Sequence, residues 1–269
     1  MTHGAAPHDH HDDHPEGLHE DLRKIASRRD ALRIFGGAGL ATILASCGGS
    51  SVTTLAGAAT PTSEVPDETA GPYPGDGSNG PNVLDDSGIV RHDIRTSFGT
   101  SSGTATGIPL RVNLTVTDAS KDYAPMAGAA VYLWHCDRAG RYSMYSSGVT
   151  DQNYLRGVVQ TDEDGTAWFK TVFPGCYSGR WPHIHFEVYS SVANAVRSGP
   201  IVKTSQIALP KATCAKVYAK SSYASSRRNL ANISLASDNV FRDDKAIHQL
   251  ATVTGNATKG FVANLTIGV

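Results

Sequence analysis

The sequence predicts an all-β domain, either a β-sandwich or a barrel, because apolar and polar side chains alternate with a period of two along several short segments. These segments are residues 110–117, 130–134, 167–172, 184–188 and 261–267. An Asp-Glu-Asp-Gly run at residues 162–165 is a tight-turn signal that leads directly into one of them. The body of the chain has no long segment with helical periodicity, so either two packed sheets or a barrel is expected.

The first residues of the chain do not resemble that domain. Residues 1–20 are rich in His and Asp and contain few large apolar side chains, so they cannot bury enough surface to offset the entropy of ordering. Six of the eleven histidines lie here. This composition indicates a disordered, solvated tail in preference to a specific metal site.

An export signal follows the tail. Arg28 and Arg29 precede an apolar run at residues 34–45, which is too short to span a bilayer comfortably. The paired arginines resemble a twin-arginine signal, and the Leu-Ala-Ser-Cys sequence ending at Cys47 resembles a bacterial lipoprotein processing site. The signal predicts an exported protein, either anchored to the cell surface by a lipid on Cys47 or secreted. A plain N-terminal anchor helix with an incidental cysteine is the alternative.

The rest of the chain is expected to form a flexible linker and one domain. Residues 48–65 are small, polar and punctuated by prolines, as in a tether, and residues 66–269 suit a single core. With 24 basic and 25 acidic side chains and a pI near 6.8, the chain has no nucleic-acid footprint. Membrane contact is expected only through Cys47, and the sequence leaves the oligomeric state open.

Two histidines separated by one residue are the first candidate ligands. On a strand, His183 and His185 share one face while Ile184 points the other way, into a core. Side-by-side imidazoles can chelate a metal, whereas a lone strand histidine is usually structural. The pair also occurs in cupin-type sites, but those add a glutamate four or five residues later, where this chain has Tyr189 and Ser190.

Tyrosine is the candidate for the missing anionic ligand. Tyr177 lies in a Pro-Gly-Cys-Tyr turn just before the histidines, and Tyr142 follows the segment 130–134. A phenolate is a hard oxygen donor that suits Fe(III) better than zinc or Cu(I). Two phenolates and a hydroxide would balance a trivalent ion in a dry pocket. Each tyrosine taken alone is more simply a packed amphipathic side chain.

Longer motifs add a family resemblance. They are residues 68–73, 91–94, 131–142, 155–165 and 173–185. Together they resemble the intradiol ring-cleavage dioxygenases, the family that includes catechol and protocatechuate dioxygenases, over roughly residues 66–245. The resemblance implies a β-sandwich core with long active-site loops and a resident Fe(III). It also implies that O2 cleaves the ring of a small aromatic diol, a catechol-type substrate, to give a muconate-type diacid.

The resemblance also assigns roles to residues. It implies four iron ligands: Tyr142, Tyr177, His183 and His185. Tyr142 would also accept a proton from the substrate. Arg180 matches the family's pocket arginine, whose fixed charge would stabilise an anion, and its alternative is a surface salt bridge. Tyr73 falls where the family lines the substrate mouth.

Two departures from the family limit what the resemblance carries over. The loop between Tyr177 and His183 is shorter than in well-known soluble members, which leaves the preferred catechol open. The helical dimerisation segment of the catechol dioxygenases is missing, so their dimer is not implied. Two other hypotheses stay open at this point: a cupin-like His-metal oxidoreductase, and a surface-anchored β-sandwich that binds without catalysis.

Cysteines are few. Apart from Cys47 the chain has three, so at most one intrachain disulfide can form. We predict that Cys176 pairs with Cys214, which would pin the turn that carries Tyr177.

Overall fold

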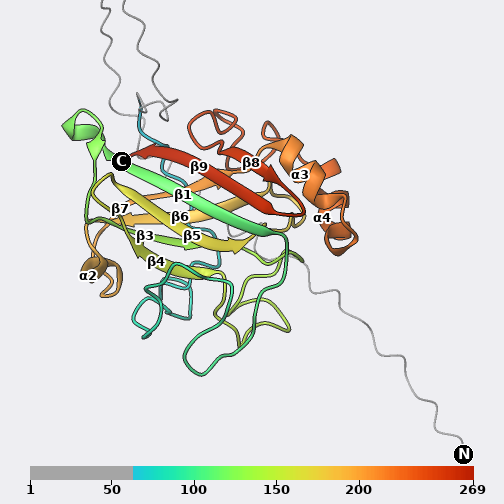
Figure 1. Cartoon of the computed structure of the whole chain (residues 1–269), viewed down its shortest axis with the longest axis horizontal. Helices are drawn as coiled ribbons and strands as arrows, with labels where there is room; N and C mark the ends of the chain where they lie inside the picture. Colours follow the sequence, from blue (N-terminus) through green and yellow to red (C-terminus); the bar gives the residue numbers. More distant parts are fainter. Residues whose placement is uncertain (1–62) are drawn as a thin grey trace, which may run out of the picture.

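The computed structural model describes residues 63–269 (Figure 1). The predicted tail and export signal at residues 1–47, with Cys47, and all but the end of the predicted linker at residues 48–65 lie outside the described residues. From its first residues the described chain contacts the domain. Val65 is buried, and its N–H donates a hydrogen bond to the Gly268 carbonyl at 3.1 Å.

Two stacked sheets form the domain, which confirms the predicted all-β sandwich (Figure 1). One sheet has the strand order β2-β1-β9-β8, with β5 also paired to β1, and the other has the order β4-β3-β6-β7. The strands are β1 (Pro109–Asp118), β2 (Ala124–Pro125), β3 (Ala130–Trp134), β4 (Arg156–Gln160), β5 (Thr166–Val172), β6 (His183–Tyr189), β7 (Ile201–Ala208), β8 (Thr252–Asn256) and β9 (Gly260–Gly268). Among these strands, only β1 and β9 pair in parallel.

All five segments predicted from alternation are strands, namely β1, β3, β5, β6 and β9, and their observed bounds differ from the predicted ones by at most one residue at each end. The alternation did not predict β2, β4, β7 or β8. β4 is buried at its first four positions, so it lacks the in-and-out pattern of a half-exposed strand.

The core lies between the sheets and explains the alternation. Apolar side chains of β1 such as Val112 and Leu114 meet those of β6 such as Phe186, and all are essentially inaccessible to solvent. Each buried side chain of this size stabilises the fold by roughly 1.5–3 kcal/mol. β6 is buried at all seven positions, because loops cover the face that points away from this core. That second, polar face carries His183 and His185.

Short helices pack at the edge of the sandwich (Figure 1). α3 (Lys211–Tyr218), η2 (Ser221–Tyr223) and α4 (Ala224–Ala231) follow one another between β7 and β8, whereas η1 (Ala119–Lys121) and α2 (Val192–Ala195) are single turns. None of these helices has more than eight residues, in agreement with the absence of a long helical period. The described residues include no helix with the length and apolarity that crossing a bilayer requires.

Candidate metal centre

The two histidines of β6 turn their rings toward a common point. His183 Nε2 and His185 Nε2 lie 3.1 Å apart, and both side chains are almost completely buried. His183 Nδ1 lies 2.5 Å from the Trp181 carbonyl, so this nitrogen carries the proton and Nε2 presents its lone pair. The ring of His185 stacks on Trp134, with centroids 4.9 Å apart and planes 6° from parallel. Both imidazoles are therefore held in place before any ligand binds.

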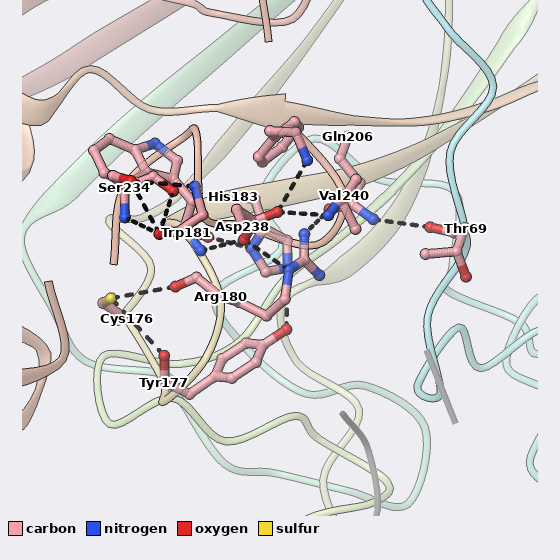
Figure 2. Close-up of polar contacts among 12 residues, drawn as sticks. Thr69, Cys176, Tyr177, Arg180, Trp181, His183, Gln206, Ser234, Asp238 and Val240 are labelled. Carbon is pink, nitrogen blue, oxygen red and sulfur yellow. Dashed lines mark hydrogen bonds and ion pairs between the residues drawn. The ribbon is translucent and has the colours of Figure 1, made fainter. Parts of the chain in front are cut away.

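Both tyrosines reach the same point from separate loops. Tyr142 Oη lies 3.3 Å from His183 Nε2 and 3.2 Å from His185 Nε2. Tyr177 Oη lies 3.2 Å from His183 Nε2, and Figure 2 shows its ring directed at that imidazole. The structure thus brings together the four residues that the sequence predicts as ligands.

Close backbone packing joins the two tyrosine loops. The Gly175 N–H donates to the Asp137 carbonyl at 3.0 Å, and a Cβ on Gly175 would lie within 2.9 Å of three backbone atoms of residues 137–140. Gly140, with φ of 86°, packs in turn against Tyr177. Any larger residue at position 175 would push the loops apart, so this glycine is required for the close approach.

Side chains from the helical segment, residues 211–231, hydrogen-bond to the turn that carries Tyr177. The Cys176 N–H donates to Ser226 Oγ at 2.9 Å, and Asn229 Nδ2 donates to the Cys176 carbonyl at 2.7 Å. The hydroxyls of Tyr218 and Tyr223 donate to the carbonyls of Pro174 and Phe173, at 3.1 and 2.9 Å. Four side chains from this helical segment therefore fix the backbone just before Tyr177.

The predicted Cys176–Cys214 disulfide is wrong. All three cysteines in the described part of the chain are free thiols in the interior. Cys176 Sγ faces the Arg180 carbonyl at 3.5 Å, while Cys214 Sγ, on α3, faces the Leu209 carbonyl at 3.8 Å. The hydrogen bonds from α4 hold the Tyr177 turn in place of a covalent link.

The donor set fits a hard metal cation. Nearest donor atoms are 3.1–3.3 Å apart, a spacing compatible with neighbouring ligands on one ion at bond lengths of about 2.0–2.1 Å. Burial lowers the pKa of His183 to about 3 and lowers that of His185 well below its ordinary value, so both rings are neutral donors. Burial raises the pKa of Tyr142 well above its ordinary value, so its phenol stays protonated unless a cation compensates the charge.

The site differs from metal sites built from His, Cys, Asp and Glu because two of its four donors are tyrosines. Within residues 63–269 no group of three or more His, Cys, Asp or Glu side chains is placed to hold a metal ion. His185 Nδ1 has no hydrogen-bond partner among the described residues. Glu187, on the same face of β6, accepts a hydrogen bond from the Tyr189 hydroxyl at 2.7 Å. The centre thus rests on two imidazoles and two phenols.

Arg180 lies inside the protein beside the four donors. Its side chain is 1% exposed and pairs with Asp238, Nε to Oδ2 at 3.0 Å, so the alternative of a surface salt bridge is wrong. Its Nη2 donates to Gln206 Oε1 at 2.6 Å. The charge of Arg180 also opposes protonation of His183 and favours the phenolate of Tyr142. Asp238 and Gln206 were not predicted, since only the fold brings these distant residues to Arg180.

Aromatic side chains border the donors. The ring centroid of Tyr73 lies 5.1 Å from those of both Tyr142 and Tyr145, so the residue predicted at the substrate mouth lies next to the centre. Arg156, which the sequence did not single out, is completely buried and donates to the Pro74 carbonyl at 2.8 Å. It also donates to Ser143 Oγ at 3.1 Å and to the Ser143 carbonyl at 3.0 Å. Arg156 thereby ties the Tyr73 segment to the residue after Tyr142.

Fold and site together define a β-sandwich protein with a candidate mononuclear centre of two histidines and two tyrosines. A family model described as "Dioxygenase" matches residues 79–198, the part that contains all four donors and Arg180. Catechol 1,2-dioxygenase 1 of Acinetobacter lwoffii is 35% identical to this chain over 32% of this chain and 33% of its own length. Hydroxyquinol 1,2-dioxygenase of a Rhizobium species (strain MTP-10005) is 38% identical over 21% and 19%. The chain matches a third or less of these curated relatives.

A solved structure matches over a longer region. It is an intradiol ring-cleavage dioxygenase from Tetranychus urticae, 26% identical, with a TM-score of 0.59, and the match covers 77% of this chain and 94% of that one. The chain is therefore similar in sequence and in fold to the intradiol ring-cleavage dioxygenases, the family that the sequence motifs resemble. These matches favour neither the cupin-like hypothesis nor the non-catalytic one.

Proposed function

We propose that this protein is a non-haem Fe(III) dioxygenase that uses O2 to open the ring of a catechol-type diol between its hydroxylated carbons, giving a muconate-type diacid. The observation that supports this most is the convergence of two phenol oxygens and two imidazole nitrogens, each of which lies 3.1–3.3 Å from at least one of the others. Similarity to the intradiol dioxygenases supports the choice of reaction, since the relatives that match are named catechol, hydroxyquinol and chlorocatechol 1,2-dioxygenases.

Ferric iron, held by Tyr142, Tyr177, His183 and His185, would supply the redox chemistry that makes an aromatic diol reactive toward O2. The phenolates offset two of its three positive charges, so a buried site carries little net charge. Neutral imidazoles complete the set without adding charge, because burial keeps the pKa of both histidines low. These features suit iron(III) better than a softer or divalent ion.

The chain itself contributes a base and a fixed positive charge. Tyr142 Oη, which lies within 3.3 Å of both imidazoles, is placed to accept a proton from one hydroxyl of the diol when it is a phenolate. Arg180 is held rigidly by Asp238 and Gln206, so its charge can stabilise an anionic substrate without reorganising. Tyr73 and Tyr145 form aromatic walls beside Tyr142, which would exclude water and orient a flat ring.

The deciding experiment is spectroscopic and kinetic. We expect the protein loaded with Fe(III) to show a visible phenolate-to-iron band that shifts when catechol is added without oxygen, and to consume O2 as the diacid forms. Tyr177→Phe should lose most of the band, whereas the control Tyr123→Phe, a tyrosine of the β1–β2 turn, should keep it. A colourless wild-type protein, or one that consumes no O2 with catechol, hydroxyquinol or chlorocatechol, would refute the proposal.

We also propose that the protein is exported and carries a lipid on Cys47. The support is the order of Arg28-Arg29, the apolar run 34–45 and the Leu-Ala-Ser-Cys sequence. Cys47→Ser should move the protein from the membrane fraction to the soluble fraction of a bacterial host that processes such signals. An unchanged distribution would exclude lipidation at this residue.

A further inference from the structure

Asp238 is a completely buried carboxylate in the segment between α4 and β8, and it lies 58 residues along the chain from Arg180, with which it pairs. Its Oδ2 accepts hydrogen bonds from Arg180 Nε at 3.0 Å and from the Trp181 N–H at 2.6 Å. Its Oδ1 accepts from the N–H groups of Val240 and Phe241, at 2.8 and 3.0 Å. Figure 2 shows Asp238 beside the arginine and the backbone that leads to His183.

Two connections run from Asp238 to the metal centre. The first is the guanidinium of Arg180, whose other edge donates to Gln206, while Gln206 Nε2 donates to the Thr69 carbonyl at 2.9 Å. The second is the backbone of Trp181, whose N–H donates to Asp238 and whose carbonyl accepts the Nδ1 proton of His183. Asp238 therefore touches both the fixed charge and the backbone that orients a metal ligand.

Only a carboxylate satisfies these contacts. Each of its two oxygens accepts two hydrogens, whereas asparagine would direct an NH2 group at two N–H donors. Burial alone would raise the pKa of Asp238, but Arg180 and the backbone N–H groups of Trp181 and Phe241 outweigh it, and the pKa lies below its ordinary value. The group is thus an anion in the interior, and it offsets the charge of Arg180.

We propose that Asp238 is a positioning residue of the centre, which fixes the orientation of Arg180 and, through the backbone of Trp181, that of His183. The inference rests on the proposed function for its kinetic part and only on the metal centre for the rest. It assigns one residue to two effects, one on turnover through Arg180 and one on metal retention through His183. A residue that merely stabilises the fold would not separate these effects.

The test is a double-mutant cycle with Asp238→Asn and Arg180→Gln. Each single variant should lower kcat by about 10- to 100-fold, the range found when outer partners of a metal site are removed. The double variant should be no more than about threefold below the slower single variant, because Asp238 acts on turnover through Arg180. The control Asp244→Asn removes a carboxylate in the same segment that accepts from the Ala246 N–H at 2.7 Å, and it should match wild type. Losses that multiply in the double variant would overturn the proposal.

Loss of Fe(III) to a competing chelator provides the second measurement. Asp238→Asn should lose iron about tenfold faster than wild type, while Arg180→Gln, which keeps the Trp181 contact, should stay within about twofold. If Asp238→Asn alone does not fold, the double variant is measured in its place, because it also removes the buried charge of Arg180 that Asp238→Asn leaves unpaired. The double variant is compared with Arg180→Gln, and equal rates of iron loss in the two would overturn the proposal. If wild type holds iron but opens no diol, the proposed function is wrong, and the chelator comparison still decides the role of Asp238.

Discussion

Replacing Ser226 with alanine tests whether the helical segment holds the Tyr177 turn. Ser226 is completely buried, and its Oγ accepts the N–H of Cys176 at 2.9 Å. Alanine leaves that buried N–H without an acceptor, which destabilises the fold by about 1–3 kcal/mol. For a domain of this size, about 2–4 °C per kcal/mol gives a melting temperature lower by about 2–12 °C.

The same substitution should weaken the metal site. Cys176 immediately precedes Tyr177, so a loosened peptide gives the phenol more freedom, and we expect iron to be lost to a chelator about tenfold faster. Asn229→Ala removes only the partly buried bond to the Cys176 carbonyl and should lower stability by about 1 kcal/mol.

Ser225→Ala is the matched control, since this neighbour on α4 is only partly buried and should change stability by less than about 0.5 kcal/mol. Calorimetry on iron-free protein gives the stability of each variant, and a chelator assay gives the rate of iron loss. If Ser226→Ala melts at the wild-type temperature and keeps its iron as long as wild type does, the hydrogen bond between Ser226 and Cys176 does not support Tyr177.

Three further predictions follow from other buried groups. Arg156→Lys cannot replace all the hydrogen bonds to Pro74 and Ser143, so KM for the diol should rise about tenfold, the equivalent of about 1.4 kcal/mol, while an unchanged KM would exclude a role in shaping the substrate site. Burial lowers the pKa of His135 from 6.5 to about 4, so the iron-free fold loses stability as the pH falls from about 6.5 toward 4; His135 contributes up to about 1.4 kcal/mol per unit, beside the losses from His183 and His185, so His135→Gln should make the slope of acid unfolding curves less steep, and an equally steep slope would contradict the assignment. Burial raises the pKa of all three thiols, to about 12 for Cys176, so a thiol reagent should detect three thiols, and only after the protein is unfolded in the absence of a reductant. A single reactive thiol in the unfolded protein would instead indicate a disulfide. The three are Cys136, Cys176 and Cys214.

The strands that the sequence predicts best are those with one face in the core and one face more exposed. β1 shows this pattern fully, since Val112 and Leu114 are buried between the exposed Arg111 and the partly exposed Asn113 and Thr115. β4 does not show it, because loops cover its outer face as well, and its burial hides the period of two. Periodicity reports the contrast between faces, so a strand covered on both sides cannot be found by it.

At the metal centre, the sequence predicts the residues but not what holds them. The spacing of His183 and His185 is local information, because alternate residues of one strand must share a face. Asp238 and Ser226 act on the centre across more than 40 residues of intervening chain, and their residue types are common in loops and helices. Nothing in a single sequence marks them, so only coordinates relate them to the ligands. The disulfide failed for the same reason, since the orientation of a thiol is not encoded in its spacing.

The convergence of the four donors follows from the pairing of β3 with β6. These strands are antiparallel with Trp134 opposite His185, so the end of β3 and the start of β6 lie at the same edge of the sheet. The chain leaving β3 carries Tyr142, and the chain entering β6 carries Tyr177, so both loops must begin or end beside the histidines. Gly175 then lets the two loops pack together closely enough for both phenols to reach them. A register shift of one residue in this pair would turn His183 and His185 into the apolar core and leave the tyrosines with no partner, so the register of β3 and β6 specifies the site as directly as the ligands do.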